Sequence, residues 1–151
     1  MERAELLPQL CLEGTNLLLL EMPFDQWTSD MAKAGEEIIR KRGLHVVLAH
    51  VERYERFQKD KTTWDRILDM PLTIQLNAES FNDAGSFLRP NKEHKFCMRM
   101  IEEHDSVILG SDCHNMKERK PNLGAAAERI TRKLGKDTMD WIYDKERSIL
   151  R

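Results

Sequence analysis

Four short apolar runs alternate along the chain with segments of helical periodicity, and this alternation constrains the fold more than any other feature. The runs cover residues 17–20, 44–49, 72–76 and 107–109. The last run, 107–109, is short, branched and without polar alternation, which is typical of a parallel strand that is buried on both faces. Strands that alternate with helices predict a parallel sheet with right-handed crossovers, in a barrel or in a doubly wound layer. We therefore expect one α/β domain over residues 1–151.

Five segments between or after these runs carry the capping side chains, prolines and glycines that begin and end helices. The predicted helices run from Thr28 or Ser29 through Arg42, from Thr62 or Thr63 to Pro71, from Pro90 to about His104, from Pro121 to Gly135, and around Thr138 to Tyr143. The residues after Asn77 are predicted to form a polar loop that contains a glycine.

A polar residue follows the end of each predicted strand. The positions of these residues help to choose between a barrel and a doubly wound sheet. The four residues are Glu21, His50, Asn77 and Asp112. In a β/α barrel the active site collects at the carboxyl-terminal rim, where several strands each contribute a residue. The chain has no glycine-rich phosphate loop of the GxGxxG or Walker type. A barrel is therefore the expected architecture.

The stretch Ile-Leu-Gly-Ser-Asp-Cys-His-Asn, residues 108–115, places an acid, a thiol and an imidazole directly after a strand. If the backbone stays extended there, Asp112 and His114 leave it on the same face and can converge on one point. A converging carboxylate and imidazole suit a divalent metal. An Asx-type turn beside a solvated histidine is the alternative, and this stretch alone leaves both open.

Carboxylates and imidazoles at the strand ends make up a mixed oxygen and nitrogen ligand set, which suits manganese, zinc or iron better than calcium or magnesium alone. The candidate metal ligands are Glu21, His50, Asp112 and His114. Taken singly, Glu21 can pair with a nearby cation and His50 can be a core imidazole, but their shared position favours a metal site. We assign His45 to the interior of the second strand, and we expect His94 and His104 to be solvated on a charged helix.

Two arginines complement these candidate ligands. Arg53 follows His50 by three residues, and Arg119 follows Asp112 by seven. A planar guanidinium binds phosphate or carboxylate through paired hydrogen bonds, although either arginine could instead form a surface ion pair. Metals and arginines at one rim indicate the hydrolysis of phosphate esters.

Composition limits the classes of partner. The chain is 40% hydrophobic and 33% charged, as in soluble globular proteins, and its net charge of -2 gives no cationic field for nucleic acid or anionic membranes. Its longest apolar run, 17–20, is too short to cross a bilayer. Cys11, Cys97 and Cys113 are odd in number and form no CxxC pair, which fits a reducing compartment. We therefore expect a cytoplasmic protein that neither binds nucleic acid nor inserts into a membrane.

Five segments, in their order and spacing, resemble one known family. They are LLLLEMPF, LAHVERY, IQLNAES, ILGSDCHN with a following R-x-P, and YDKERSIL. The chain is similar over nearly its whole length to the bacterial capsule-type protein-tyrosine phosphatases of the PHP (polymerase and histidinol phosphatase) superfamily. The resemblance implies a distorted, TIM-like β/α barrel with a multinuclear, often Mn²⁺-dependent site. It also implies that the substrates are phosphotyrosine proteins, namely the bacterial tyrosine autokinases that govern capsule and exopolysaccharide export.

Carried over by position, the resemblance implies residue roles and also shows two departures. It implies that Glu21, His50, Asp112 and His114 bind metal, and that Arg53 and Arg119 hold the phosphoryl group. Val51 replaces the proline usual after the motif histidine. The family's N-terminal His-x-His strand has no counterpart, because no histidine precedes His45. The chain thus resembles the carboxyl-terminal part of the barrel, and open strand edges would favour self-association or binding of the missing segment.

Three other functions stay open. Cys113 and Arg119 have the Cys-x5-Arg spacing of cysteine-dependent tyrosine phosphatases. Their phosphate loop usually needs glycine and small residues, and His-Asn-Met-Lys-Glu supplies none. A barrel that lacks part of its ligand set could also be an inactive, binding-only remnant. A metal site does not determine which alcohol is released from the phosphate ester. A histidinol-phosphatase-like phosphoesterase is therefore the third alternative.

Overall fold

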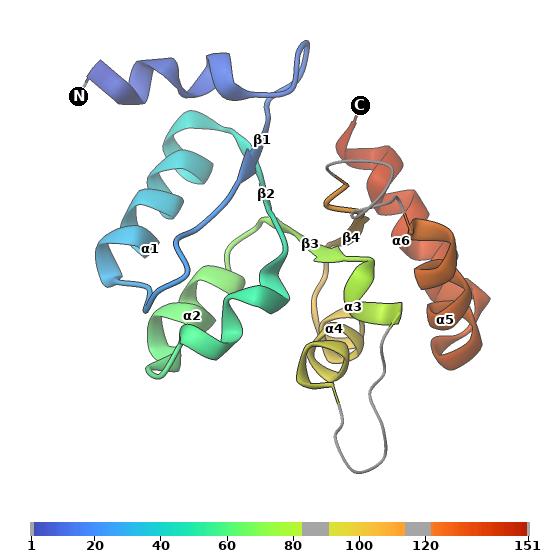
Figure 1. Ribbon diagram of the computed structural model, residues 1–151. Coiled ribbons are helices and arrows are strands. Elements are labelled where there is room, and N and C mark those ends of the chain that lie inside the picture. The colour runs from blue at the N-terminus through green and yellow to red at the C-terminus, as the bar shows by residue number, and fades with distance from the viewer. Residues whose placement is uncertain (1, 83–90, 114–121, 151) are drawn as a thin grey trace.

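The computed structural model describes residues 2–82, 91–113 and 122–150, and these form a parallel sheet flanked by helices (Figure 1). The strands are β1 (Leu17–Leu20), β2 (His45–Leu48), β3 (Thr73–Asn77) and β4 (Val107–Gly110). All neighbouring pairs are parallel, and the strands lie in sequence order. The predicted α/β class and its parallel sheet are therefore confirmed. This described sheet has β1 and β4 as its edges, and the closed barrel stays a prediction.

Helices follow or connect the strands. The α-helices are α1 (Ser29–Glu36), α2 (Lys61–Leu68), α3 (Glu79–Asn82), α4 (Lys92–Glu103), α5 (Leu123–Leu134) and α6 (Lys136–Ile149). A π-helical turn, η2 (Glu37–Lys41), continues α1, and the 3₁₀ helices are η1 (Glu2–Leu10), η3 (Val51–Arg53) and η4 (Glu55–Phe57). None of the helices within the described residues is long and apolar enough to span a membrane.

The N-terminal cap of α1 was predicted correctly, whereas that of α2 was not. Thr28 caps α1, and its side chain accepts a hydrogen bond from the Met31 N–H. The expected cap of α2 at Thr62 or Thr63 is wrong, because Asp60 accepts the Thr62 N–H at 2.9 Å and the helix begins at Lys61. A carboxylate at this position satisfies an N–H group that has no partner within the helix.

Two further elements, α3 and α6, differ from the prediction because of their tertiary contacts. α3 occupies part of the predicted loop, and Phe81 within it is completely buried. α6 extends well beyond the predicted Thr138 to Tyr143, and Glu146 in its added turns accepts the Leu109 N–H of β4 at 3.2 Å. Tertiary packing, more than local propensity, sets these helix boundaries.

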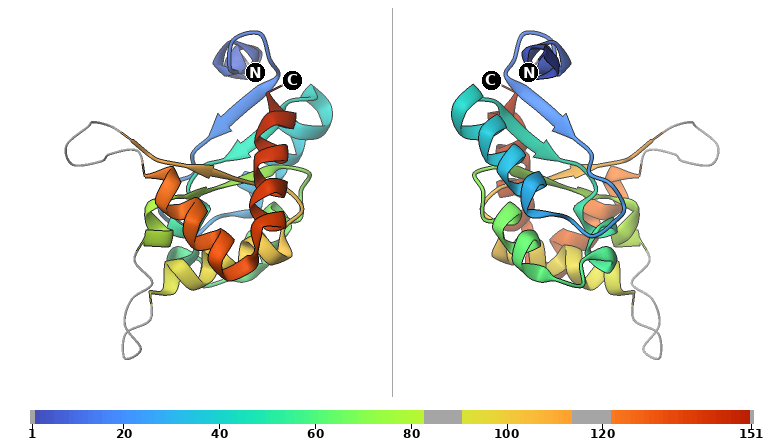
Figure 2. Two further views of the ribbon diagram at one scale, coloured as in Figure 1. Left: turned by 90° about the vertical axis from the view of Figure 1, so that its right-hand side faces the viewer. Right: turned by 90° about the vertical axis from the view of Figure 1, so that its left-hand side faces the viewer.

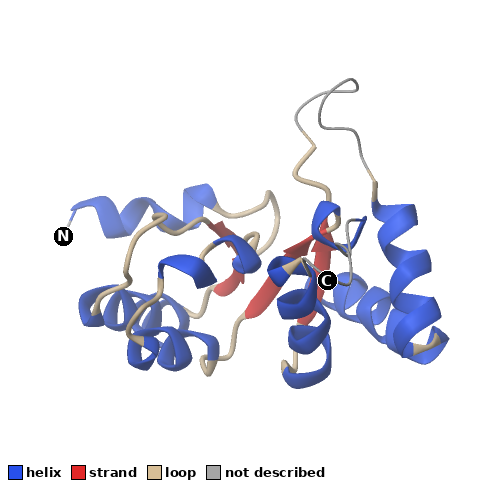
Figure 3. Ribbon diagram, turned by 60° about the horizontal axis from the view of Figure 1, so that its bottom comes forward, coloured by secondary structure: helices blue, strands red, loops and turns tan. Residues whose placement is uncertain are grey.

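The register of the sheet places one row of apolar residues under the helices. Leu20, Leu48, Ile74 and Val107 are neighbours across the four strands and therefore share one face. Helices α1 and α2 lie beside β1 and β2, while α5 and α6 lie beside β4, at the other end of the sheet (Figures 1 and 3). Figure 2 shows the two helix pairs from opposite sides of the molecule. One core thus connects both ends of the sheet.

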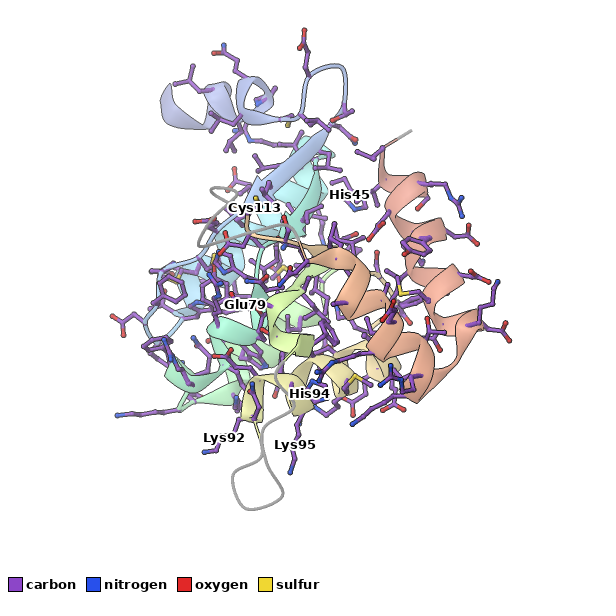
Figure 4. All side chains as sticks on the ribbon, turned by 45° about the vertical axis from the view of Figure 1, so that its right-hand side comes forward. His45, Glu79, Lys92, His94, Lys95 and Cys113 are labelled. Carbon is purple, nitrogen blue, oxygen red and sulfur yellow. The ribbon has the colours of Figure 1, made fainter. Side chains whose placement is uncertain are left out.

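The histidines outside the predicted site have different environments. His45 lies in β2 as predicted, with Nε2 2.8 Å from Thr73 Oγ1. The expectation that His94 is solvated is wrong, because it is buried on the inner face of α4 against the edge of the Phe81 ring. His104 is half-buried at the end of α4, with Nε2 3.1 Å from the Leu68 carbonyl oxygen. Figure 4 labels His94 together with Lys92 and Lys95 of the same helix, and both lysines are exposed.

Candidate active site

The polar residues at the strand ends lie along one edge of the sheet, because all four strands run in the same direction. Glu21 directly follows β1, His50 comes two residues after β2, Asn77 is the last residue of β3, and Asp112 comes two residues after β4. Three of these predicted positions, those of Glu21, His50 and Asp112, take part in close side-chain pairs at this edge.

Glu21 and His50 form the first pair. His50 Nε2 lies 3.3 Å from Glu21 Oε1. Two ligand atoms that each lie about 2.1 Å from one ion stand roughly 3.0–3.4 Å apart in octahedral or tetrahedral geometry. His50 is only 5% exposed, and its Nδ1 atom is buried without a hydrogen-bond partner in the described part of the chain. The chemistry and separation of these donors therefore fit a divalent cation.

Arg53 and Asp112 form the second pair. Arg53 Nη1 lies 2.8 Å from Asp112 Oδ2, and both side chains are largely buried. The guanidinium is thereby held at the same edge as the Glu21–His50 pair. A positive charge so placed can bind the oxygens of a phosphoryl group.

The backbone is in the left-handed region at both His50 and Asp112, with φ values of 36° and 47°. Within the described residues, they are the two non-glycine residues with positive φ. Such conformations cost about 1–3 kcal/mol and cluster at functional sites. The premise of an extended chain at Asp112 is thus wrong, and the backbone N–H of Cys113 instead donates to Ser111 Oγ at 3.2 Å.

A single 3₁₀ turn joins His50 to Arg53. The Arg53 N–H donates to the His50 carbonyl at 3.1 Å, and the Tyr54 N–H donates to the Val51 carbonyl at 3.1 Å. His50 caps this turn at its N-terminal side, and Arg53 is its last residue. This turn explains the spacing of three residues between the candidate ligand and the candidate phosphate-binding arginine.

Glu52, within the same turn, was missed by the sequence analysis. Its carboxylate points inward, is 2% exposed, and accepts the Asn77 N–H at 3.4 Å and the Ser80 hydroxyl at 3.3 Å. Burial raises the pKa of the Glu52 carboxyl to about 7, although these hydrogen bonds and Arg53 oppose the shift. Glu52 therefore attaches the His50–Arg53 turn to the end of β3.

Tyr54 connects the turn to the segment after β1. Its hydroxyl accepts the Met22 N–H at 3.0 Å, and its ring lies 5.2 Å from the His50 ring. The side chain is fully buried, and burial raises the pKa of the Tyr54 hydroxyl to about 12. Because Met22 directly follows Glu21, this hydrogen bond fixes the backbone beside one candidate ligand relative to the other.

Two glutamines join the same segments further out. Gln58 Oε1 accepts the Trp27 N–H at 2.9 Å, and Gln58 Nε2 donates to the Asp25 carbonyl at 2.9 Å. In return, Gln26 Oε1 accepts the N–H groups of Lys59 and Asp60 at 2.8 and 3.0 Å. Residues 21–28 and 49–60 are therefore interlocked, and they carry Glu21, His50 and Arg53 as one unit.

Gly110 has a steric role where β4 ends. A Cβ atom built on Gly110 would overlap the side-chain amide of Gln75 on β3. Gln75 pairs with Ile108 in the register, so its side chain occupies the space that a residue at 110 would need. The glycine of the ILGSDCHN stretch thus permits close packing directly before Asp112.

Not all predicted site residues are brought together. Within residues 2–82, 91–113 and 122–150, no group of three or more His, Cys, Asp and Glu side chains is arranged to hold a metal ion. His114 and Arg119 lie outside the described residues. The structure thus supplies two adjacent pairs, Glu21–His50 and Arg53–Asp112, as the described part of the site.

Comparison with known proteins gives consistent matches. The family model "Capsular polysaccharide synthesis, CpsB/CapC" matches residues 2–151. The tyrosine-protein phosphatase CpsB of Streptococcus agalactiae serotype V is 27% identical over 153 residues, which cover 100% of this chain and 63% of that protein. The tyrosine-protein phosphatase YwqE of Bacillus subtilis (strain 168) is 23% identical over 145 residues, which cover 94% of this chain and 54% of that protein.

A solved structure shows the same fold. It belongs to a study of YwqE from Bacillus subtilis and CpsB from Streptococcus pneumoniae, described there as unique metal-dependent tyrosine phosphatases. The TM-score is 0.81 at 22% identity, and the match covers 100% of this chain and 60% of the other. The chain therefore spans about three fifths of the length of such relatives. Because the family model matches nearly every residue, the chain belongs to the CpsB/CapC family of capsular polysaccharide synthesis proteins.

Proposed function

We propose that this chain forms part of a metal-dependent phosphatase that hydrolyses phosphotyrosine on proteins. The observation that carries the proposal is the pairing of Glu21 with His50, one 3₁₀ turn away from the Arg53 guanidinium. This arrangement combines a cation-binding donor pair with a cationic group suited to phosphate. The phosphatase names of the relatives support the same activity.

One set of residues would bind the metal, and a second set would bind the phosphoryl group. Glu21, His50, Asp112 and His114 would hold the metal, for which Mn²⁺ is our first choice and Zn²⁺, Fe²⁺ or Mg²⁺ the alternatives. A bound divalent ion would supply Lewis-acid stabilisation of the charge that develops on phosphate oxygens. Arg53 and Arg119 would bind the remaining phosphoryl oxygens. Asp112 also holds the Arg53 guanidinium, with its Oδ2 atom 2.8 Å from Arg53 Nη1.

The proposed substrate is a phosphotyrosine protein, namely a bacterial tyrosine autokinase that controls capsule or exopolysaccharide export. The family description and the phosphatase names of the relatives support this choice. We propose that the reaction takes place in the cytoplasm. Cys11 and Cys97 form no disulfide in the described structure, which suits a reducing compartment.

A binding-only role is the second candidate, favoured by the pair-wise arrangement of the described ligands. Two donors hold a divalent ion less firmly than the four that structural and catalytic sites commonly use. Leu19 on the edge strand β1 is 58% exposed, as expected of a surface that a second copy or a further segment covers. In this alternative the chain self-associates or binds a partner without turning over a phosphate ester.

Turnover of aryl phosphates with and without metal distinguishes the two candidates. The 151-residue chain is treated with chelator, dialysed, and assayed with p-nitrophenyl phosphate and a phosphotyrosine peptide before and after addition of Mn²⁺. Phosphatase activity that appears only with the metal, and that is lost in His50→Ala, supports the proposal. Activity that survives exhaustive metal removal would contradict the metal-dependent mechanism, and no activity with metal would favour the binding-only role.

A further inference from the structure

Phe24 is an exposed aromatic residue at the candidate active site. Its side chain is 51% exposed, although its neighbours Trp27 and Tyr54 are almost completely buried. The Phe24 ring stacks on His50 with 5.9 Å between centroids and an interplanar angle of 13°. An exposed ring that is stacked on a candidate metal ligand lies next to any substrate bound there.

The Phe24 ring packs against two other aromatic rings, which hold it in place. It lies 5.2 Å from the Tyr54 ring and 5.9 Å from the Phe57 ring, in tilted arrangements that suit aromatic pairs. The flanking backbone is fixed as well, because the Trp27 indole N–H donates to the Pro23 carbonyl at 3.2 Å. The position of Phe24 is therefore set before any substrate binds.

We propose that Phe24 forms an aryl-binding subsite that contacts the tyrosyl ring of the substrate, an inference that rests on the proposed function. In an aryl phosphate the ring is separated from phosphorus by a single bridging oxygen. A phosphoryl group bound beside His50 and Arg53 therefore brings its ring close to the exposed part of Phe24. Alkyl phosphates, such as phosphoserine, have no ring to place there, so Phe24 selects for phosphotyrosine.

The expected contribution is modest and measurable. Aromatic pairs in favourable geometry are worth enough to change an equilibrium constant about two- to tenfold. Phe24 should therefore set the preference for aryl over alkyl phosphates, while the metal and Arg53 set the affinity for the phosphoryl group itself.

The test compares two non-hydrolysable ligands. Benzylphosphonate, in which a CH2 group replaces the bridging oxygen, and methylphosphonate are titrated by calorimetry into the Mn²⁺-loaded 151-residue chain, and Mn²⁺ affinity is measured separately. We expect the parent to bind benzylphosphonate about two- to tenfold more tightly than methylphosphonate. Phe24→Ala should lose this preference and keep the affinities for Mn²⁺ and methylphosphonate, while Phe24→Tyr should retain it. Tyr143→Ala, which removes a comparably exposed ring on α6, is the matched control and should change nothing.

Different results would overturn the Phe24 subsite alone or the proposed function together with it. If methylphosphonate binds but the parent shows no aryl preference, or if Phe24→Ala keeps the preference, the subsite is wrong and the proposed function stands. Equal losses of Mn²⁺ and of both phosphonates in Phe24→Ala would show a structural role only and also overturn the subsite. If neither phosphonate binds the Mn²⁺-loaded parent, the proposed function fails and the inference fails with it.

Discussion

Replacing Tyr54 with phenylalanine removes one hydroxyl group from the joint between the segments that carry Glu21 and His50. The hydroxyl accepts the Met22 N–H at 3.0 Å. The remaining ring still packs against Trp27, at 5.3 Å between centroids, so the substitution isolates the hydrogen bond from the packing.

The lost hydrogen bond determines how much Tyr54→Phe lowers the free energy of unfolding. Tyr54→Phe leaves the Met22 N–H without its partner, and an unsatisfied buried donor costs about 1–3 kcal/mol. Because the Met22–Tyr54 bond is only partly buried, we expect a loss of about 1–2 kcal/mol in the free energy of unfolding. Tyr54→Ala also removes the ring and should cost about 3–5 kcal/mol.

Urea unfolding followed by circular dichroism, in the presence of chelator, measures these losses. Tyr143→Phe, at an exposed position on α6, is the matched control and should change the free energy by less than about 0.5 kcal/mol. The Mn²⁺ affinity of Tyr54→Phe should also fall, because the backbone beside Glu21 becomes less constrained. A Tyr54→Phe variant as stable as the parent would refute the claim that this hydroxyl joins the two segments.

Three further substitutions test other parts of the site. Arg53→Ala should lower kcat/KM for phosphotyrosine about 10- to 100-fold by removing a charge-assisted contact, with a native circular dichroism spectrum; an unchanged rate would exclude Arg53 from phosphate binding. Between pH 4.5 and 7, folded Glu52 holds a proton that the unfolded chain has released, so this group lowers the free energy of unfolding as pH rises. In chelator, Glu52→Gln should remove that slope and be more stable than the parent at pH 8, and an unaltered slope would count against the burial argument. Gly110→Ala should cost at most about 1 kcal/mol, because a methyl group there overlaps only the flexible end of the Gln75 side chain, which can move aside. Gln75→Ala should recover that loss, and additive effects in the double variant would contradict the steric explanation.

The sequence predicted those features that depend on local pattern. The apolar run at 17–20 became β1, in which Leu17 and Leu18 are buried while Leu19 stays exposed. Thr28 was predicted as a cap because its side chain needs only the next turn of the helix. The placement of polar residues at the strand ends followed from the parallel direction of the strands.

Features that depend on distant partners could not be predicted from one sequence. Glu52 is buried because Asn77 and Ser80, more than twenty residues away, donate to it. Gln58 and Gln26 look like surface residues until the two segments face each other, at a separation of more than thirty residues. Tyr54 lies in the LAHVERY segment, but the partner of its hydroxyl group, the Met22 N–H, is 32 residues away along the chain.

The left-handed backbone at Asp112 shows a different limit. The prediction that Asp112 and His114 share a face assumed extended backbone, whereas the φ of Asp112 is 47°. Nothing in the residue types requires this conformation, although aspartate tolerates it better than most residues. The ion pair with Arg53, from another loop, accompanies the conformation that the structure adopts.

Direct titration of Mn²⁺ tests the central claim that Glu21 and His50 hold a divalent metal. Isothermal calorimetry on the metal-free 151-residue chain is compared with the same titration of Glu21→Gln, which keeps the size of the side chain and removes its charge. Lys33→Gln, on the exposed face of α1, is the control. We expect saturable Mn²⁺ binding to the parent and to the control, and binding at least tenfold weaker in Glu21→Gln. Equal Mn²⁺ affinity in the parent and Glu21→Gln, or no binding to the parent, would contradict this claim.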